Sequence, residues 1–137
     1  VADRKTVLIP DRRGNNRLDT LKNIVRDGRI ALLFLIPGVG ETMRINGRAS
    51  LSADPELCSS FTVKGKTPAT VIVVTVESIY VQCSKALVRS KLWDADAKVT
   101  RAELPSMGDM IKMLADESFD SEAFEANYPK LLKETLY

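Results

Sequence analysis

A fixed cation beside a predicted helix start is the first feature of this sequence that can do chemistry. Residues 14–16 are Gly-Asn-Asn, a run that favours a turn, and Asn16 or Asp19 can cap a helix that follows. Arg17 is then next to free backbone N–H groups, where the helix dipole also favours negative charge. This arrangement binds anions such as phosphate. Taken alone, the local pattern favours the simpler alternative, a capped helix with a solvated arginine.

A second set of polar side chains lies on one face of an expected strand. The stretch Thr42–Ser52 alternates cleanly between apolar and polar residues, with Arg44 and Asn46 on the polar face. Solvent is the default surrounding for such a face. Because a Pro-Gly turn joins this strand to Arg29–Ile36, the two are expected to form a hairpin, and the polar face can then line a groove. Gly47 inside the strand permits a bulge or a close backbone approach.

A third set of candidate residues follows the longest apolar run. Lys85 and Arg89 are four residues apart, so they share one face of a helical turn and repel each other unless an anion lies between them. Their spacing does not decide between an anionic partner and a solvated face. Trp93 comes next. It either stacks on a planar ring or, as is more usual, packs in a core or an interface.

Composition excludes several classes of site. The 137 residues include no histidine and two cysteines, which rules out zinc sites built from Cys and His clusters and any mechanism with a histidine base. We therefore expect no metal centre. Two cysteines do not make a disulfide scaffold, and no apolar run approaches the roughly 20 residues that span a bilayer. A reduced, cytoplasmic protein that does not bind membranes is the expectation.

Charge is distributed unevenly along the chain. Residues 1–48 carry ten Lys/Arg and five Asp/Glu, whereas residues 49–137 carry ten Lys/Arg and thirteen Asp/Glu. A basic first third attracts a phosphate ligand or a nucleic acid. Because it lacks the dense basic patch with interleaved aromatic residues that is typical of nucleic-acid binding, a small anion is favoured and no nucleic acid is expected. The Lys- and Gly-containing loop at residues 64–68 does not have the glycine spacing of a phosphate loop.

The elements that must position these residues are short strands and helices. Besides the strand already described, strands are expected at Val7–Pro10, Arg29–Ile36 and Ala69–Val81. The strand Arg29–Ile36 is expected to be buried. In the strand Ala69–Val81, the lack of alternation over Val71–Val74 indicates burial on both faces, as in a strand of a barrel that also contacts a partner subunit. Helices are expected at 18–27, 54–61 and within 83–93, at 107–115 after a Ser106 cap, from Ser121 or Asp120 to Phe124, and from Tyr128-Pro129 onward.

Four motifs stand in order along the chain. They are LIPDRRGNNRLDTLKN at residues 8–23, FLIPG at 34–38, ETMRINGRA at 41–49 and CSKALVRSKLW at 83–93. This series resembles the pyridoxamine 5′-phosphate oxidase-like flavoproteins over almost the whole chain, and most of all a bacterial branch of uncertain substrate. The resemblance implies a mainly β, α+β fold with peripheral helices: a single FMN-binding split β-barrel domain over residues 1–137, which forms a homodimer with FMN at the subunit interface.

The resemblance also implies a set of cofactor contacts. In this family the cation that opens the short helix after a strand binds the FMN phosphate, and Arg17 occupies that position. The strand with Arg44 and Asn46 lies near the cofactor, and the segment from Lys85 to Trp93 reaches the cofactor or substrate pocket, in the same or the partner subunit. The implied FMN contacts are Asn16, Arg17, Thr20, Arg44, Asn46, Lys85, Arg89 and Trp93. No catalytic residue is identified.

Two departures from the branch bear on function. The branch has an N-terminal segment with opening strands and a Ser-Pro-Lys/Arg-Gly-like stretch near the phosphate, and this sequence is expected to lack or not show it. The position before Cys83 is commonly histidine in the branch but is Gln82 here. Glutamine cannot replace a titrating imidazole, although it still donates and accepts hydrogen bonds.

The resemblance implies an FMN-dependent oxidoreductase. The flavin would supply two-electron chemistry toward a small organic substrate, and the protein would supply binding, orientation and electrostatics. Lys85 or Arg89 would hold an anionic substrate or stabilise negative charge near reduced flavin. A non-catalytic flavin-binding carrier or sensor is the alternative. A small nucleic-acid-binding barrel is a third and less favoured reading, and the sequence names neither the substrate nor the electron acceptor.

Overall fold

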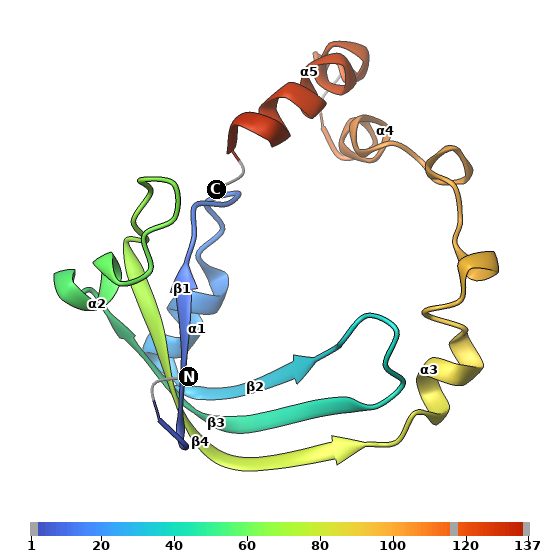
Figure 1. Cartoon of the computed structure of the whole chain (residues 1–137). Helices are drawn as coiled ribbons and strands as arrows, with labels where there is room; N and C mark the ends of the chain where they lie inside the picture. The colour runs from blue at the N-terminus through green and yellow to red at the C-terminus, as the bar shows by residue number, and fades with distance from the viewer. Residues whose placement is uncertain (1–2, 116–117, 136–137) are drawn as a thin grey trace. The chain divides into compact units, whose positions relative to one another are not determined.

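The computed structural model describes residues 3–115 and 118–135. The chain divides into two units between Trp93 and Asp94, and each unit is described by itself. The first unit contains a β-sheet and three helices, and the second contains only helices and short 3-10 turns (Figure 1). The single split-barrel domain expected over residues 1–137 stays a prediction.

The first unit is built on one four-stranded antiparallel sheet with the strand order β1-β4-β3-β2. Its elements, in chain order, are β1 (Thr6–Asp11), α1 (Asp19–Arg26), β2 (Arg29–Phe34), β3 (Thr42–Ser52), α2 (Pro55–Ser59), β4 (Thr70–Gln82) and α3 (Lys85–Ser90). Each strand and helix expected in this part of the sequence is present. An antiparallel sheet with accompanying helices confirms the α+β class.

A bulge bends the two long strands of the sheet. The register of β3 against β4 shifts after Asn46, so that Glu77 is the extra residue on β4. The two backbones are so close there that a Cβ on Gly47 would lie 2.1 Å from the carbonyl oxygen of Thr75. Bulges bend strands and increase their twist, and Figure 1 shows the curvature of β3 and β4. Gly47 therefore provides the bulge and the close approach that the sequence indicated.

The core lies on one face of the sheet, on the β1 side of the bulge. Ile24 of α1 packs there against Ala49 of β3 and against Ile72 and Val74 of β4. Six partly buried side chains surround this cluster: Val7, Ile9, Leu21, Ile30, Leu32 and Leu51. The apolar stripe of α1 thus covers one half of the sheet and holds the start of that helix beside the end of β1.

The apolar run at the start of β4 is buried on both faces, as its lack of alternation predicted. Val71 and Val74 are fully buried, Ile72 is 9% exposed and Val73 is half-buried. Cys58 of α2 is also buried, and its Sγ lies 3.8 Å from the carbonyl oxygen of Ala69. This half of β4 is therefore covered by helices on two sides.

The end of α1 is fixed to β3 by two backbone features. The N–H of Ala49 donates to the carbonyl oxygen of Gly28 at 2.6 Å, and a Cβ on Gly28 would lie 2.7 Å from the Ala49 carbonyl oxygen.

The Asp27 carboxylate accepts hydrogen bonds from the Nε and backbone N–H of Arg29. These bonds, with the side-chain bond the larger cause, lower the pKa of Asp27 below its usual value.

The prediction that Arg29–Ile36 forms a buried strand is wrong. The strand ends at Phe34 and lies at the sheet edge, paired only with β3. Leu33, Phe34 and Ile36 are 52%, 37% and 60% exposed. The reason is geometric: α1 covers the sheet only on the β1 side of the bulge, so the apolar run extends past the covered half.

The second unit is helical. It contains 3-10 turns at Ala95–Ala97 and Arg101–Glu103, then α4 (Met107–Lys112) and α5 (Ser121–Thr135). Ser106 caps α4 as predicted, through a capping box with Asp109. The side-chain hydrogen bond from Ser106, with its backbone N–H bond second, lowers the pKa of Asp109. The two helices α4 and α5 are joined by a hydrogen bond from the Gly108 N–H to Glu125 Oε1, at 2.5 Å.

The two last helices expected from the sequence are one helix. Asp120 accepts from the N–H of Ala123 at 2.9 Å and so caps α5, but the helix continues past Pro129 to Thr135. Proline inside a helix loses one bond of the ladder, and its ring crowds the carbonyl four residues earlier. The rings of Phe124 and Tyr128, with centroids 5.5 Å apart, stack across the turn just before it. Local contacts therefore maintain the helix where the sequence pattern indicated a break.

We predict that Gly47→Ala destabilises the protein by about 2 kcal/mol, because the new methyl group forces the β3 and β4 backbones apart. The free energy of unfolding from urea denaturation is the measurement. Gly14→Ala is the matched control, since a Cβ on Gly14 meets nothing within 4 Å. A loss of stability of the same size in both variants would show that the close approach at Gly47 is not what matters.

Candidate functional site

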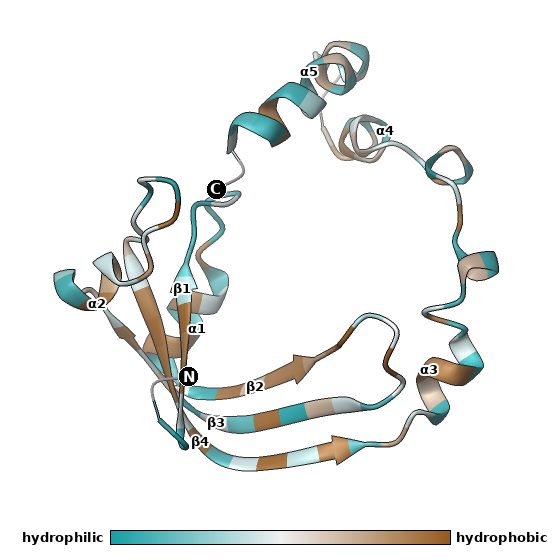
Figure 2. Cartoon of the chain, viewed as in Figure 1, coloured by the Kyte–Doolittle hydropathy of each residue, from teal (hydrophilic) through white to brown (hydrophobic). Residues whose placement is uncertain are grey.

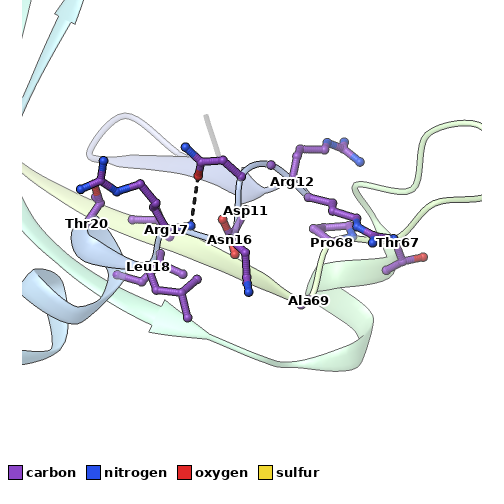
Figure 3. A pocket seen from close by; sticks show the side chains of 14 residues that line it. Asp11, Arg12, Asn16, Arg17, Leu18, Thr20, Thr67, Pro68 and Ala69 are labelled. Carbon is purple, nitrogen blue, oxygen red and sulfur yellow. Dashed lines mark hydrogen bonds between the residues drawn. The ribbon is translucent and has the colours of Figure 1, made fainter. Parts of the chain in front are cut away.

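The turn after β1 and the start of α1 line the candidate site, a cavity of about 770 Å³. Its lining residues are 11–18, 20, 21, 67–69 and 72. In Figure 3 the Arg17 and Thr20 side chains lie at one side, and Thr67 and Pro68 at the other. Cavities that hold small molecules in proteins have volumes of roughly 300–1,000 Å³. The cavity is therefore of the size that binds a ligand.

Arg17 is held at the mouth of the cavity by local contacts. Its Nη2 lies 3.3 Å from the Asp19 carboxylate, and both side chains are mostly exposed, at 77% and 68%. Its backbone N–H donates to Asn15 Oδ1 at 3.0 Å. Asn16 adopts the left-handed conformation with φ of 59°, as the Gly-Asn-Asn run allows. Exposed ion pairs are weak, so an anion that enters the cavity competes with Asp19 for this guanidinium.

The prediction that Asn16 or Asp19 caps α1 is wrong. The N-cap is Leu18, and no side chain accepts a hydrogen bond at this helix start. Asn16 lies too early in the turn, and the Asp19 carboxylate pairs with Arg17 instead. The first-turn N–H groups of a helix have no partner within the helix. The start of α1 thus has no side-chain cap, and Leu18, Thr20 and Leu21 from it line the cavity. A helix start of this kind favours an anion.

Arg44 and Asn46 do not lie in this cavity. Leu51 of β3 pairs with Ile72 at the cavity edge, and Arg44 is seven residues earlier, roughly 23 Å along the same bent strand. Arg44 Nε donates to Gln82 Oε1 at 2.6 Å across the β3–β4 pair. Gln82 thus contacts an arginine and does not line the cavity.

Lys85, Arg89 and Trp93 lie at the other end of β4 from the cavity. The strand runs from Ile72 at the cavity to Gln82 just before α3, a path of about 33 Å along the bent strand. Lys85 and Arg89 are exposed on α3, while Trp93 is half-buried. The indole N–H of Trp93 donates to the carbonyl oxygen of Val39 in the β2–β3 turn, at 2.8 Å. Its role within this chain is packing against that turn.

Of the eight residues predicted to contact a cofactor, the structure brings three together: Asn16, Arg17 and Thr20. Sequence reasoning missed the rest of the cavity wall. Arg12 and Arg13 were visible as two cations in the same turn as Arg17. The wall at residues 67–69 was not detectable, because it reaches the cavity through the pairing of Asp11 with Thr70.

Two classes of site are not found in the part of the chain that the structure describes. No group of three or more Cys, Asp or Glu side chains there is arranged to hold a metal ion. No helix of residues 3–115 or 118–135 has the length and apolar character that crossing a bilayer requires.

The fold and the cavity define the class first: an α+β protein with an arginine-lined cavity at the junction of a strand and a helix. The family model described as pyridoxamine 5′-phosphate oxidase matches residues 1–83, which include this cavity. The chain therefore belongs to the pyridoxamine 5′-phosphate oxidase family. A search of curated proteins gives no match.

Two solved structures are similar to about three fifths of this chain. HupZ of Group A Streptococcus is 21% identical, with a TM-score of 0.50 over 61% of this chain and 68% of that one. A variant of the same protein is 21% identical, with a TM-score of 0.49 over 60% and 70% of the two chains. At this identity the similarity to HupZ concerns the fold alone.

Proposed function

We propose that this protein binds FMN and that the FMN phosphate lies in the cavity at the start of α1. One observation carries the proposal: a guanidinium and a helix start without a side-chain cap converge on one cavity. Arg17 would supply the charge, and the first-turn N–H groups of α1 would donate hydrogen bonds. Arg13, exposed on the same cavity, would add a second guanidinium.

The donor set of the cavity fits a phosphate. Three arginines line it, at positions 12, 13 and 17. Of the nearby carboxylates, Asp11 accepts from the Thr70 hydroxyl at 3.3 Å and Asp19 pairs with Arg17. The excess of positive charge supports a dianionic group, because each charge-assisted bond to phosphate is stronger than a neutral one.

We infer that the protein is an FMN-dependent oxidoreductase that acts on a small substrate. The flavin supplies the electron transfer when bound. The chain's own residues bind and orient: Arg17 and α1 hold the phosphate, and the exposed cations Lys85 and Arg89 attract an anionic substrate. A second candidate function is flavin binding without turnover. It is favoured by the hydrogen bond between Arg44 and Gln82, because glutamine has no titratable group with which to transfer a proton.

We further propose that a second copy of the chain covers the outer half of the sheet. Beyond the bulge, apolar side chains on one face of three paired strands are exposed: Phe34 37%, Met43 37%, Ile79 54% and Val81 69%. Figure 2 shows these stretches of β2 and β4 in brown. Apolar patches that extend over several strands usually mark interfaces. A homodimer closed over this half would form the split barrel, and a partner subunit would supply Lys85, Arg89 and Trp93 to the cavity.

The first prediction concerns the cofactor. The purified protein is expected to bind FMN, and Arg17→Ala is expected to weaken binding by about 2 kcal/mol, or roughly 30-fold in Kd, because a charge-assisted phosphate contact is lost. Fluorescence titration of FMN measures both affinities. Asp19→Asn is the matched control at the same site. It removes the competing carboxylate and is expected to tighten binding a few-fold. Equal affinities in the wild type and Arg17→Ala would contradict the assignment of the cavity.

The second prediction separates the two functions. An oxidoreductase loaded with FMN is expected to oxidise NADPH or to transfer electrons to an added acceptor, whereas a carrier or sensor is not. The measurement is the absorbance of NADPH and of the flavin after mixing without oxygen. Flavin that stays oxidised with every donor tested would favour the non-catalytic candidate.

The third prediction concerns assembly. Sedimentation at micromolar concentration is expected to give a dimer, and Val81→Asp is expected to give a monomer, because it places a charge in the proposed interface. Val25→Asp is the control, since Val25 is comparably exposed, at 75%, but lies on α1 outside this surface. A wild-type monomer, or the same loss of dimer in both variants, would count against this interface.

A further inference from the structure

A tight turn directly precedes the far wall of the cavity, which consists of residues 67–69. Lys64 and Gly65 both have positive φ, 50° and 76°. The N–H of Val63 donates to the Lys66 carbonyl at 3.1 Å, and the N–H of Lys66 donates to the Val63 carbonyl at 2.9 Å. Two central residues with positive φ are typical of the rigid turns that connect hairpin strands. The segment from Phe61 to Thr67 is thus a preformed unit, and the residues that follow it line the cavity.

Arg12 fastens this turn to the end of β1. Its Nη2 donates to the carbonyl oxygen of Phe61 at 2.6 Å, and its Nη1 lies 3.4 Å from the carbonyl oxygen of Lys66. The two carbonyls come from the two arms of the turn. The side chain is half-buried, unlike those of Arg13 and Arg17. A planar guanidinium with several fixed N–H groups can bridge two acceptors in this way, whereas a lysine ammonium on a flexible stem cannot hold the same geometry.

We propose that Arg12 is a positioning residue that fixes the far wall of the cavity. The anion itself is bound by Arg13, Arg17 and the start of α1. By holding Phe61 and Lys66, Arg12 fixes where Thr67, Pro68 and Ala69 lie against the turn after β1. The second test below measures FMN affinity, so that test rests on the proposed function. The claim that Arg12 holds the turn in place rests only on the two hydrogen bonds of its side chain.

The first test does not need a ligand. Limited proteolysis with a lysine-specific protease reports on the turn, because Lys64 and Lys66 lie in it. Arg12→Met keeps the aliphatic stem and removes the donors, and is expected to raise cleavage at Lys64 and Lys66 several-fold while cleavage at Lys22 stays constant. Arg13→Met is the matched control and should change neither rate. Unchanged cleavage of the turn in Arg12→Met, or an equal rise at Lys22, would overturn the inference.

The second test distinguishes positioning from direct charge. FMN titration of Arg12→Met and Arg12→Lys is expected to show a loss of affinity of roughly tenfold in both, because lysine restores the charge but not the two-carbonyl bridge. Arg17→Lys is expected to keep part of the wild-type affinity, since a lysine binds phosphate as a point charge. Near-normal affinity in Arg12→Lys would make Arg12 a phosphate ligand and contradict the inference. Absence of FMN binding by the wild type would refute the proposed function instead, and the proteolysis comparison would still decide the role of Arg12.

Discussion

The close approach of β3 to β4 at Gly47 is the constraint on which the rest of the first unit depends. No side chain fits between that residue and the Thr75 carbonyl oxygen, and the register shifts by one residue beside it. The bulge divides the sheet into two halves that differ in their surroundings. On one side α1 covers the sheet and forms the core, and on the other Phe34 of β2, Met43 of β3 and Val81 of β4 are exposed.

The covered half of the sheet carries the candidate site, because packing of Ile24 against Ala49 and Val74 fixes α1 beside the end of β1. The cavity between them combines three kinds of positive potential: arginine side chains, a helix start without a side-chain cap, and a basic first third of the chain. Its arginines differ in what they contact. Arg12 contacts backbone carbonyls of the opposite wall, while Arg17 contacts a carboxylate that an anion can displace.

The exposed half of the sheet gives the proposed homodimer its physical basis. Lys85, Arg89 and Trp93 follow this half, at the end of β4 far from the cavity. A cofactor contact from these residues therefore requires a second chain, so the proposed dimer and the proposed site depend on each other. Membership of the pyridoxamine 5′-phosphate oxidase family is consistent with both, since the family match spans the sheet and the cavity.

The sequence by itself determined the elements and the family. Periodicity and capping residues predicted β3 to the residue and the Ser106 cap, because these depend on neighbours along the chain. Gly47 indicated only that a bulge or a close approach was permitted there. Only the tertiary structure decided burial and proximity. The exposure of β2 depends on how far α1 extends over the sheet, and the wall at residues 67–69 depends on pairing between β1 and β4. Contacts between residues far apart along the chain leave no local pattern in a single sequence. Only the tertiary structure therefore shows that Asn16, Arg17 and Thr20 share one cavity with residues 67–69.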